Sequence, residues 1–256
     1  MKLRRLASIG TIAIVVASCS CYSQSVCSNI VLINTGTYDK ERIAKEITVI
    51  NNLNPKVISI DVDFSHFLGS KGDKELILAL QNCKGLVRPS AIHSDGEDYF
   101  GKEIITVYSM GSEFFPRKAK AGFVSTRAKK GQVQIPRQFT VWQRAYGGND
   151  IYHHFSIVTA MIFDSLKAVN FMQSHDSIAD VDYNQGKRNF KIFSAQEVLD
   201  GKITKKDIEG KIIMLGFLGP GNDDKFSTPF NTNPKEPDMY GVEYLANIVA
   251  QVLENE

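Results

Sequence analysis

Short apolar runs alternate with amphipathic segments over the first third of the chain. Residues 29–33, 57–60 and 86–87 are apolar and mostly β-branched, which is typical of strands buried on both faces. The intervening segments, 43–53 and 76–83, carry apolar residues at the spacing of an amphipathic helix. A strand–helix–strand–helix–strand series predicts a parallel sheet with right-handed crossovers.

The rest of the chain adds different elements to this series. Residues 121–136 predict a β-hairpin, and the long apolar stretch 155–171 predicts a buried helix. Residues 190–193 and 212–215 are short apolar runs that predict further strands, and 242–253 has the pattern of a closing amphipathic helix. We therefore expect an α/β fold with a mixed, mainly parallel sheet, helices on both faces and an inserted β-hairpin.

The N-terminus has the pattern of an export signal. Its first five residues hold three basic side chains and no acid, and residues 6–16 are apolar. That run is too short to cross a hydrocarbon layer of roughly 30 Å at about 1.5 Å per residue. We expect a signal peptide at 1–18, a tether at 19–28 and one folded domain at 29–256.

The signal favours attachment to a lipid. Residues 16–19 resemble a bacterial lipobox, in which Cys19 would be lipidated and become the new N-terminus. The alternative is an ordinary secretory cleavage nearby, for example after Ser23. In both cases the mature chain is extracytoplasmic, either as a periplasmic protein or as a cell-envelope lipoprotein held on the membrane by its N-terminal lipid.

Charge excludes one class of partner. The formal net charge is +2, and the basic residues of the export signal account for it. The mature chain is therefore close to neutral, and no electrostatic pattern favours nucleic acid.

Two cysteines of the folded domain could form a disulfide. Cys27 precedes the first predicted strand and Cys83 precedes the third, so both would lie at the amino-terminal edge of a parallel sheet. If the strands followed a 2-1-3 order, these two strands would be neighbours, and an oxidising compartment would permit a bridge. The alternative is two unpaired thiols.

Acidic and glycine-rich segments follow two of the predicted strands. Asp61 and Asp63 come directly after one, and Asp223 and Asp224 lie in the glycine-rich loop after the strand at 212–215. Ligands bind at the carboxyl ends of strands in open α/β sheets, so these carboxylates could share a site. The alternative is that Asp61 caps backbone amides and that Asp223 and Asp224 belong to a solvated loop.

Several stretches resemble one protein family in order and spacing. They are 54–64, 121–137, 193–201, 210–229 and 240–247, which resemble the conserved elements of CHASE2 domains. The resemblance runs from about residue 30 to residue 253, and it implies an extracytoplasmic α/β domain of bacterial signal transduction. The chain ends at Glu256 without a transmembrane helix or an output domain, so we expect a freestanding domain.

A sensory domain of this kind implies binding without catalysis and without a cofactor. We expect a small-molecule ligand or a membrane signalling protein as the partner. The expected ligand-binding residues lie at the carboxyl edge of the sheet: Asp61, Asp63, Gly216, Gly219, Asp224 and Thr228.

Two alternatives remain open at this point. Asp61, Asp63, Asp223 and Asp224 could hold a cation in a metal-dependent hydrolase. The chain could also be a purely structural interaction module that docks through its closing helix.

Overall fold

The computed structural model describes residues 27–36, 39–64, 67–97, 103–124, 135–145, 149–183, 188–221, 224–233 and 235–255. Its central sheet has the order β10-β1-β11-β2-β3-β4, with β5 beside β3. The bounds are β10 (Lys191–Ser194), β1 (Ile30–Asn34), β11 (Ile212–Gly216), β2 (Val57–Ile60), β3 (Leu86–Glu97), β4 (Glu103–Ser109) and β5 (Lys120–Phe123). Only β4 pairs antiparallel within this sheet, which confirms the predicted mixed, mainly parallel arrangement.

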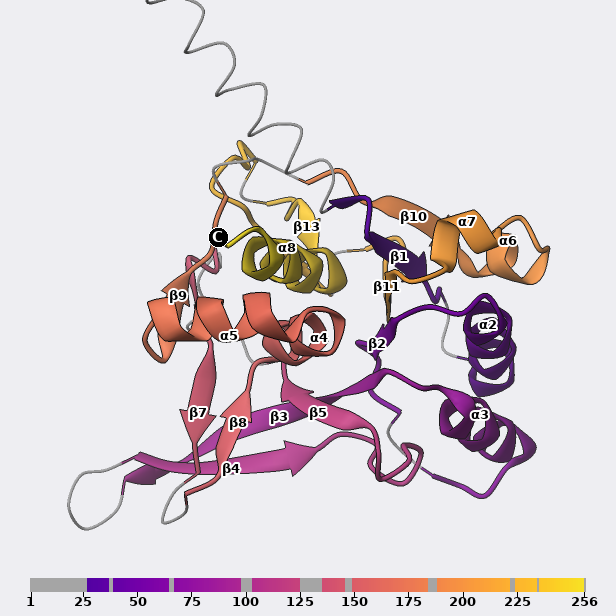
Figure 1. The fold of residues 1–256 in the computed structure, drawn as a ribbon, viewed down its shortest axis with the longest axis horizontal. Helices are drawn as coiled ribbons and strands as arrows, with labels where there is room; N and C mark the ends of the chain where they lie inside the picture. Colours follow the sequence, from indigo (N-terminus) through magenta and orange to yellow (C-terminus); the bar gives the residue numbers. More distant parts are fainter. Residues whose placement is uncertain are drawn as a thin grey trace, which may run out of the picture.

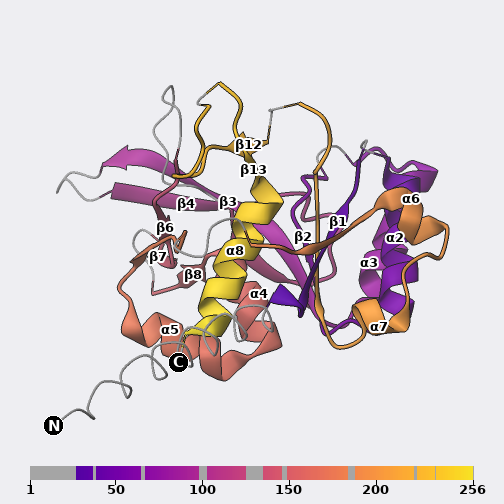
Figure 2. The same ribbon diagram turned by 90° about the horizontal axis from the view of Figure 1, so that it is seen from above.

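Helices cover both faces of the sheet (Figures 1 and 2). One face packs against α4 (Phe155–Phe163), α5 (Ser165–Ser174) and α8 (Gly241–Glu254). The other packs against α2 (Lys40–Asn52), α3 (Lys71–Asn82), α6 (Ala195–Leu199) and α7 (Lys205–Ile208). Successive residues of β1 therefore enter opposite cores: Ile30 and Leu32 face α8, whereas Val31 and Ile33 face α2.

The strand order differs from the predicted 2-1-3 arrangement, because β11 lies between β1 and β2. The predicted Cys27–Cys83 disulfide is wrong, and both cysteines are buried free thiols. Cys27 lies in the core on the α8 face, and Cys83 lies in the core on the α2 and α3 face. The sheet itself therefore separates the two sulfurs.

The middle of the chain forms small antiparallel pairs beside the sheet. They are β6 (Gln138–Thr140) with β9 (Ile178–Asp180), β7 (Trp142–Arg144) with β8 (Ile151–His153), and β12 (Lys225–Phe226) with β13 (Met239–Tyr240). Most of the hairpin predicted at 121–136 lies outside the described residues, and β5 pairs in parallel with β3. The hairpins that the structure describes are β3–β4 and β7–β8.

The apolar stretch 155–171 is two helices and not one. Asp164 has an extended backbone and ends α4, and its side chain accepts a hydrogen bond of 3.2 Å from the Lys167 amide to begin α5. Across the ranges that the structure describes, every helix falls short of the length and apolar character that a bilayer crossing requires.

Candidate functional site

The carboxyl ends of β1, β2 and β11 meet at one edge of the sheet. The Thr35 amide, just past β1, donates to the Gly216 carbonyl at 3.0 Å. The Asp61 amide, just past β2, donates to the Leu215 carbonyl at 2.8 Å. The glycine-rich loop after β11 therefore begins between the two neighbouring strand ends, as the parallel order requires.

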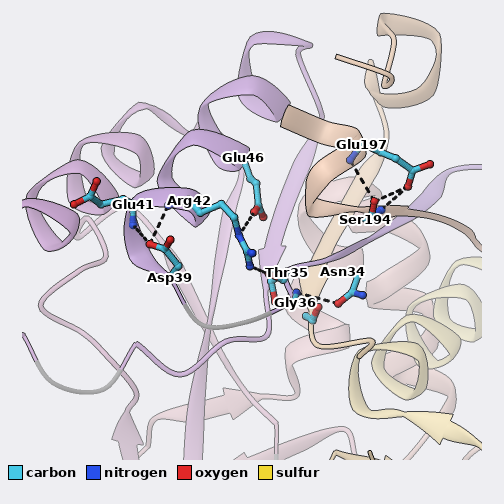
Figure 3. A network of polar contacts seen from close by, with 10 residues as sticks. Asn34, Thr35, Gly36, Asp39, Glu41, Arg42, Glu46, Ser194 and Glu197 are labelled. Carbon is cyan, nitrogen blue, oxygen red and sulfur yellow. Dashed lines mark hydrogen bonds and ion pairs between the residues drawn. The ribbon is translucent and has the colours of Figure 1, made fainter. Parts of the chain in front are cut away.

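Asn34, the last residue of β1, holds this loop in place. Its Nδ2 donates to the Leu218 carbonyl at 3.2 Å, and its Oδ1 accepts from the amides of Leu218 and Gly36, each at 3.0 Å. Figure 3 shows the side chain turned back to Gly36. The sequence analysis did not select Asn34, although an amide at the end of a strand is a recognisable turn signal.

An arginine from α2 supports the same edge from the side (Figure 3). Arg42 donates to the Thr35 carbonyl, and its Nε lies 3.1 Å from the carboxylate of the fully buried Glu46. Burial raises the pKa of Glu46 to about 7, against the opposing effect of the Arg42 charge. The loop after β1 is thus tied to a buried ion pair as well as to the loop after β11.

Asp61 and Asp224 form an acidic pair at this edge. Burial raises the pKa of Asp61 to about 7, and the Asp224 carboxylate contributes to the increase. Burial also raises the pKa of Asp224. Asp63, two residues further along, is exposed.

Asp224 lies at the amino-terminal end of α8. A Cβ added to Gly241, the first residue of that helix, would stand 2.8 Å from the Asp224 Oδ1. The Gly241 amide donates to the Asp224 carbonyl at 2.9 Å. The positive end of the helix dipole favours a carboxylate at this place. Asp224 is therefore positioned between Asp61 and the helix that closes the domain.

The predicted glycines have packing roles at the same edge. A Cβ on Gly216 would stand 2.6 Å from the Val242 Cβ, so Gly216 lets the first turn of α8 approach the sheet. A Cβ on Gly219 would meet the Phe217 ring at 2.5 Å. The Gly219 carbonyl accepts a hydrogen bond of 2.6 Å from the Tyr240 hydroxyl.

Thr228 stabilises the next part of this loop. Its amide and its hydroxyl donate to the two carboxylate oxygens of Asp238, at 2.8 and 2.7 Å. Its own hydroxyl oxygen accepts from the Phe230 amide at 3.3 Å. Thr228 therefore fixes the path of the chain between β12 and β13.

The hydrolase alternative finds no support in this geometry. Within the described ranges, no group of three or more histidine, cysteine, aspartate or glutamate side chains is arranged to hold a metal ion. Asp63 is exposed, and Asp223 lies outside the described residues. Burial raises the pKa values of both Asp61 and Asp224.

Comparison with known proteins agrees with the order of motifs in the sequence. A search of curated proteins and a search of solved structures each returned no significant match. The family model of the CHASE2 domain matches residues 4–256, which is nearly the whole chain. The chain belongs to the CHASE2 domain family, the extracytoplasmic sensory domains of signal transduction.

Proposed function

We propose that this domain is a non-catalytic receptor whose ligand binds at the carboxyl edge of the sheet. The observation that carries the proposal is the meeting of Asp61 and Asp224 beside the amino-terminal end of α8. The pair offers both hydrogen-bond acceptors and, near neutral pH, a bound proton. It suits a small polar ligand that carries hydroxyl, amide or amine groups.

The loops around the pair provide the remaining surface of the proposed site. Gly216 and Gly219 are buried, and their carbonyls accept hydrogen bonds from Thr35 and Tyr240, so they set the shape of the loop. Thr228 keeps the loop beyond Asp224 in one conformation. Asp63 would act only at the rim, since its side chain is exposed. Occupation of the site would act on α8 through Asp224 and Gly241, and α8 would pass the signal to a membrane partner.

A thermal-shift panel tests this proposal on the full exported chain. The panel contains simple sugars, amino acids, nucleotides and divalent cations at pH 7. We expect at least one class to raise the melting temperature, because a ligand at 100 times its Kd stabilises the folded state by about 2.7 kcal/mol. Mass spectrometry should recover the bound compound unchanged, because no catalytic group acts on it.

The matched variants are Asp61→Asn and Asp63→Asn. Asp61→Asn should remove most of the ligand-induced rise in melting temperature. Asp63→Asn alters an exposed carboxylate two residues away and should preserve this rise. The proposal is wrong if no class shifts the wild-type chain, or if Asp61→Asn keeps the full shift.

We further propose that Cys19 carries the lipid that holds the domain at the cell envelope. The support is the lipobox-like sequence at 16–19, which lies outside the described residues. Cells fed labelled palmitate should incorporate it into the wild-type chain and not into Cys19→Ser, while Cys21→Ser should remain labelled. An unlabelled wild-type chain in the soluble fraction would instead indicate ordinary secretion.

A further inference from the structure

A cleft beside the C-terminal half of α8 is formed by β6, β7, β9 and the end of α5. Its volume is about 620 Å³, within the roughly 300–1,000 Å³ of small-molecule sites. It is lined by Gln138, Trp142, His175, Asp176, Ser177, Ile178, Ala179 and Asp180. None of these residues belongs to the carboxyl edge described above.

The aromatic wall of the cleft is fixed by packing. Trp142 is partly buried against the core and is the one tryptophan of the chain. His175 stacks on Phe171 with ring centroids 4.1 Å apart and an interplanar angle of 17°, and its Nδ1 lies 2.9 Å from the Phe171 carbonyl. Phe171 in turn stacks on the buried Phe139, so the wall continues into the core.

The opposite wall is acidic. Asp176 and Asp180 are exposed carboxylates, and the residues that line the cleft include no lysine and no arginine. Gln138 donates to the Asp180 Oδ1 at 2.9 Å and orients this carboxylate while leaving its other oxygen available. The titratable groups that face an occupant are therefore Asp176, Asp180 and His175.

The cleft is also connected to the closing helix. Gln251 of α8 donates to the Asp180 carbonyl at 2.8 Å and accepts from the Asp182 amide at 3.0 Å. A hydrogen bond of 2.8 Å from the Val141 amide to the Ser177 carbonyl joins the two walls. The cleft is consequently a defined part of the fold and not a gap between independent loops.

We propose that this cleft binds a small quaternary ammonium compound. An indole face attracts such a cation through its quadrupole, and two carboxylates supply the opposite charge in a lining that includes no lysine or arginine. A neutral ligand would gain no charge attraction from the acidic wall, and an anion would be repelled by it. The site is separate from the proposed receptor site at Asp61 and Asp224, and each can fail without the other.

The single tryptophan gives a direct measurement. Titration of the full chain with choline should change the Trp142 fluorescence in a saturable way. The matched control is 3,3-dimethylbutan-1-ol, which has the shape of choline without its charge and should bind at least about tenfold more weakly. The double variant Asp176→Asn/Asp180→Asn should bind choline about tenfold more weakly, because it loses two exposed charge contacts of about 1 kcal/mol or less each.

Two further variants separate this site from the others. Trp142→Phe should bind choline about fivefold more weakly, measured by calorimetry, because a phenyl ring attracts cations less than an indole. Asp61→Asn should leave choline binding unchanged. The proposal is overturned if choline causes no saturable change, if the neutral alcohol binds as tightly, or if the double asparagine variant binds choline as well as the wild-type chain.

Discussion

At the scale of single residues, Gly216 shows how one missing side chain sets the position of a helix. It ends the buried strand β11, and the first turn of α8 lies directly over it. Gly216→Ala would place a Cβ 2.6 Å from the Val242 Cβ, which is closer than packed carbons can stand. We expect the overpacking to lower the free energy of unfolding by about 1–3 kcal/mol, measured by urea denaturation.

A double variant tests whether this contact is the cause. Val242→Gly removes the Cβ and both methyl groups that the new Cβ would meet, so Gly216→Ala/Val242→Gly should lose about 1 kcal/mol less than the sum of the two single changes. Strict additivity would show that Gly216 is needed for another reason, such as the backbone geometry of the loop.

The acidic residues show what sequence can and cannot provide at this scale. Asp61 and Asp224 follow strands that end at one sheet edge, so the sequence indicated that they could share a site, and in the structure the Asp224 carboxylate contributes to the raised pKa of Asp61. Asp63 follows the end of β2 and is exposed, so its predicted part in the site stays a prediction. The Asn34 side chain binds the carbonyl of Leu218, which is distant in sequence, and Arg42 binds the backbone carbonyl of Thr35. No local sequence pattern reveals either contact.

At the scale of elements, strand positions were predictable and strand neighbours were not. Apolar runs correctly located β1, β2 and β11, because a strand buried on both faces has a continuous apolar sequence, and shorter apolar pairs located β10 and the start of β3. The insertion of β11 between β1 and β2 depends on a pairing between residues about 180 positions apart. The local sequence does not indicate which distant strands pair. The incorrect strand order is the reason why the Cys27–Cys83 disulfide was predicted.

The break between α4 and α5 shows the same limit over a shorter distance. The apolar stretch 155–171 has enough hydrophobic residues for one long helix, and its few polar residues include Asp164. In the structure Asp164 leaves the helical conformation and caps the next helix. A capping aspartate can therefore redirect an apolar segment, which lets α5 pack beside α8 and places His175 at the cleft.

At the scale of the whole molecule, one sheet joins two hydrophobic cores, and each core holds one buried thiol. Cys27 lies in the core with α4, α5 and α8, and Cys83 lies in the core with α2 and α3. Burial raises the pKa of both thiols, that of Cys83 to about 11, so neither reacts readily in the folded chain. The two cysteines are therefore separate reporters for the two faces of the sheet.

Pulsed alkylation with peptide-resolved mass spectrometry uses these reporters. We expect Cys27 and Cys83 to become labelled at the same urea concentration, because successive residue pairs of β1 and β11 alternate between the two cores and the sheet joins both into one cooperative unit. Without reductant, both should be fully labelled in the denatured chain, whereas a disulfide would leave both unlabelled. Labelling of Cys83 well before Cys27 would show that α2 and α3 open as an independent unit while α8 and its face of the sheet remain folded.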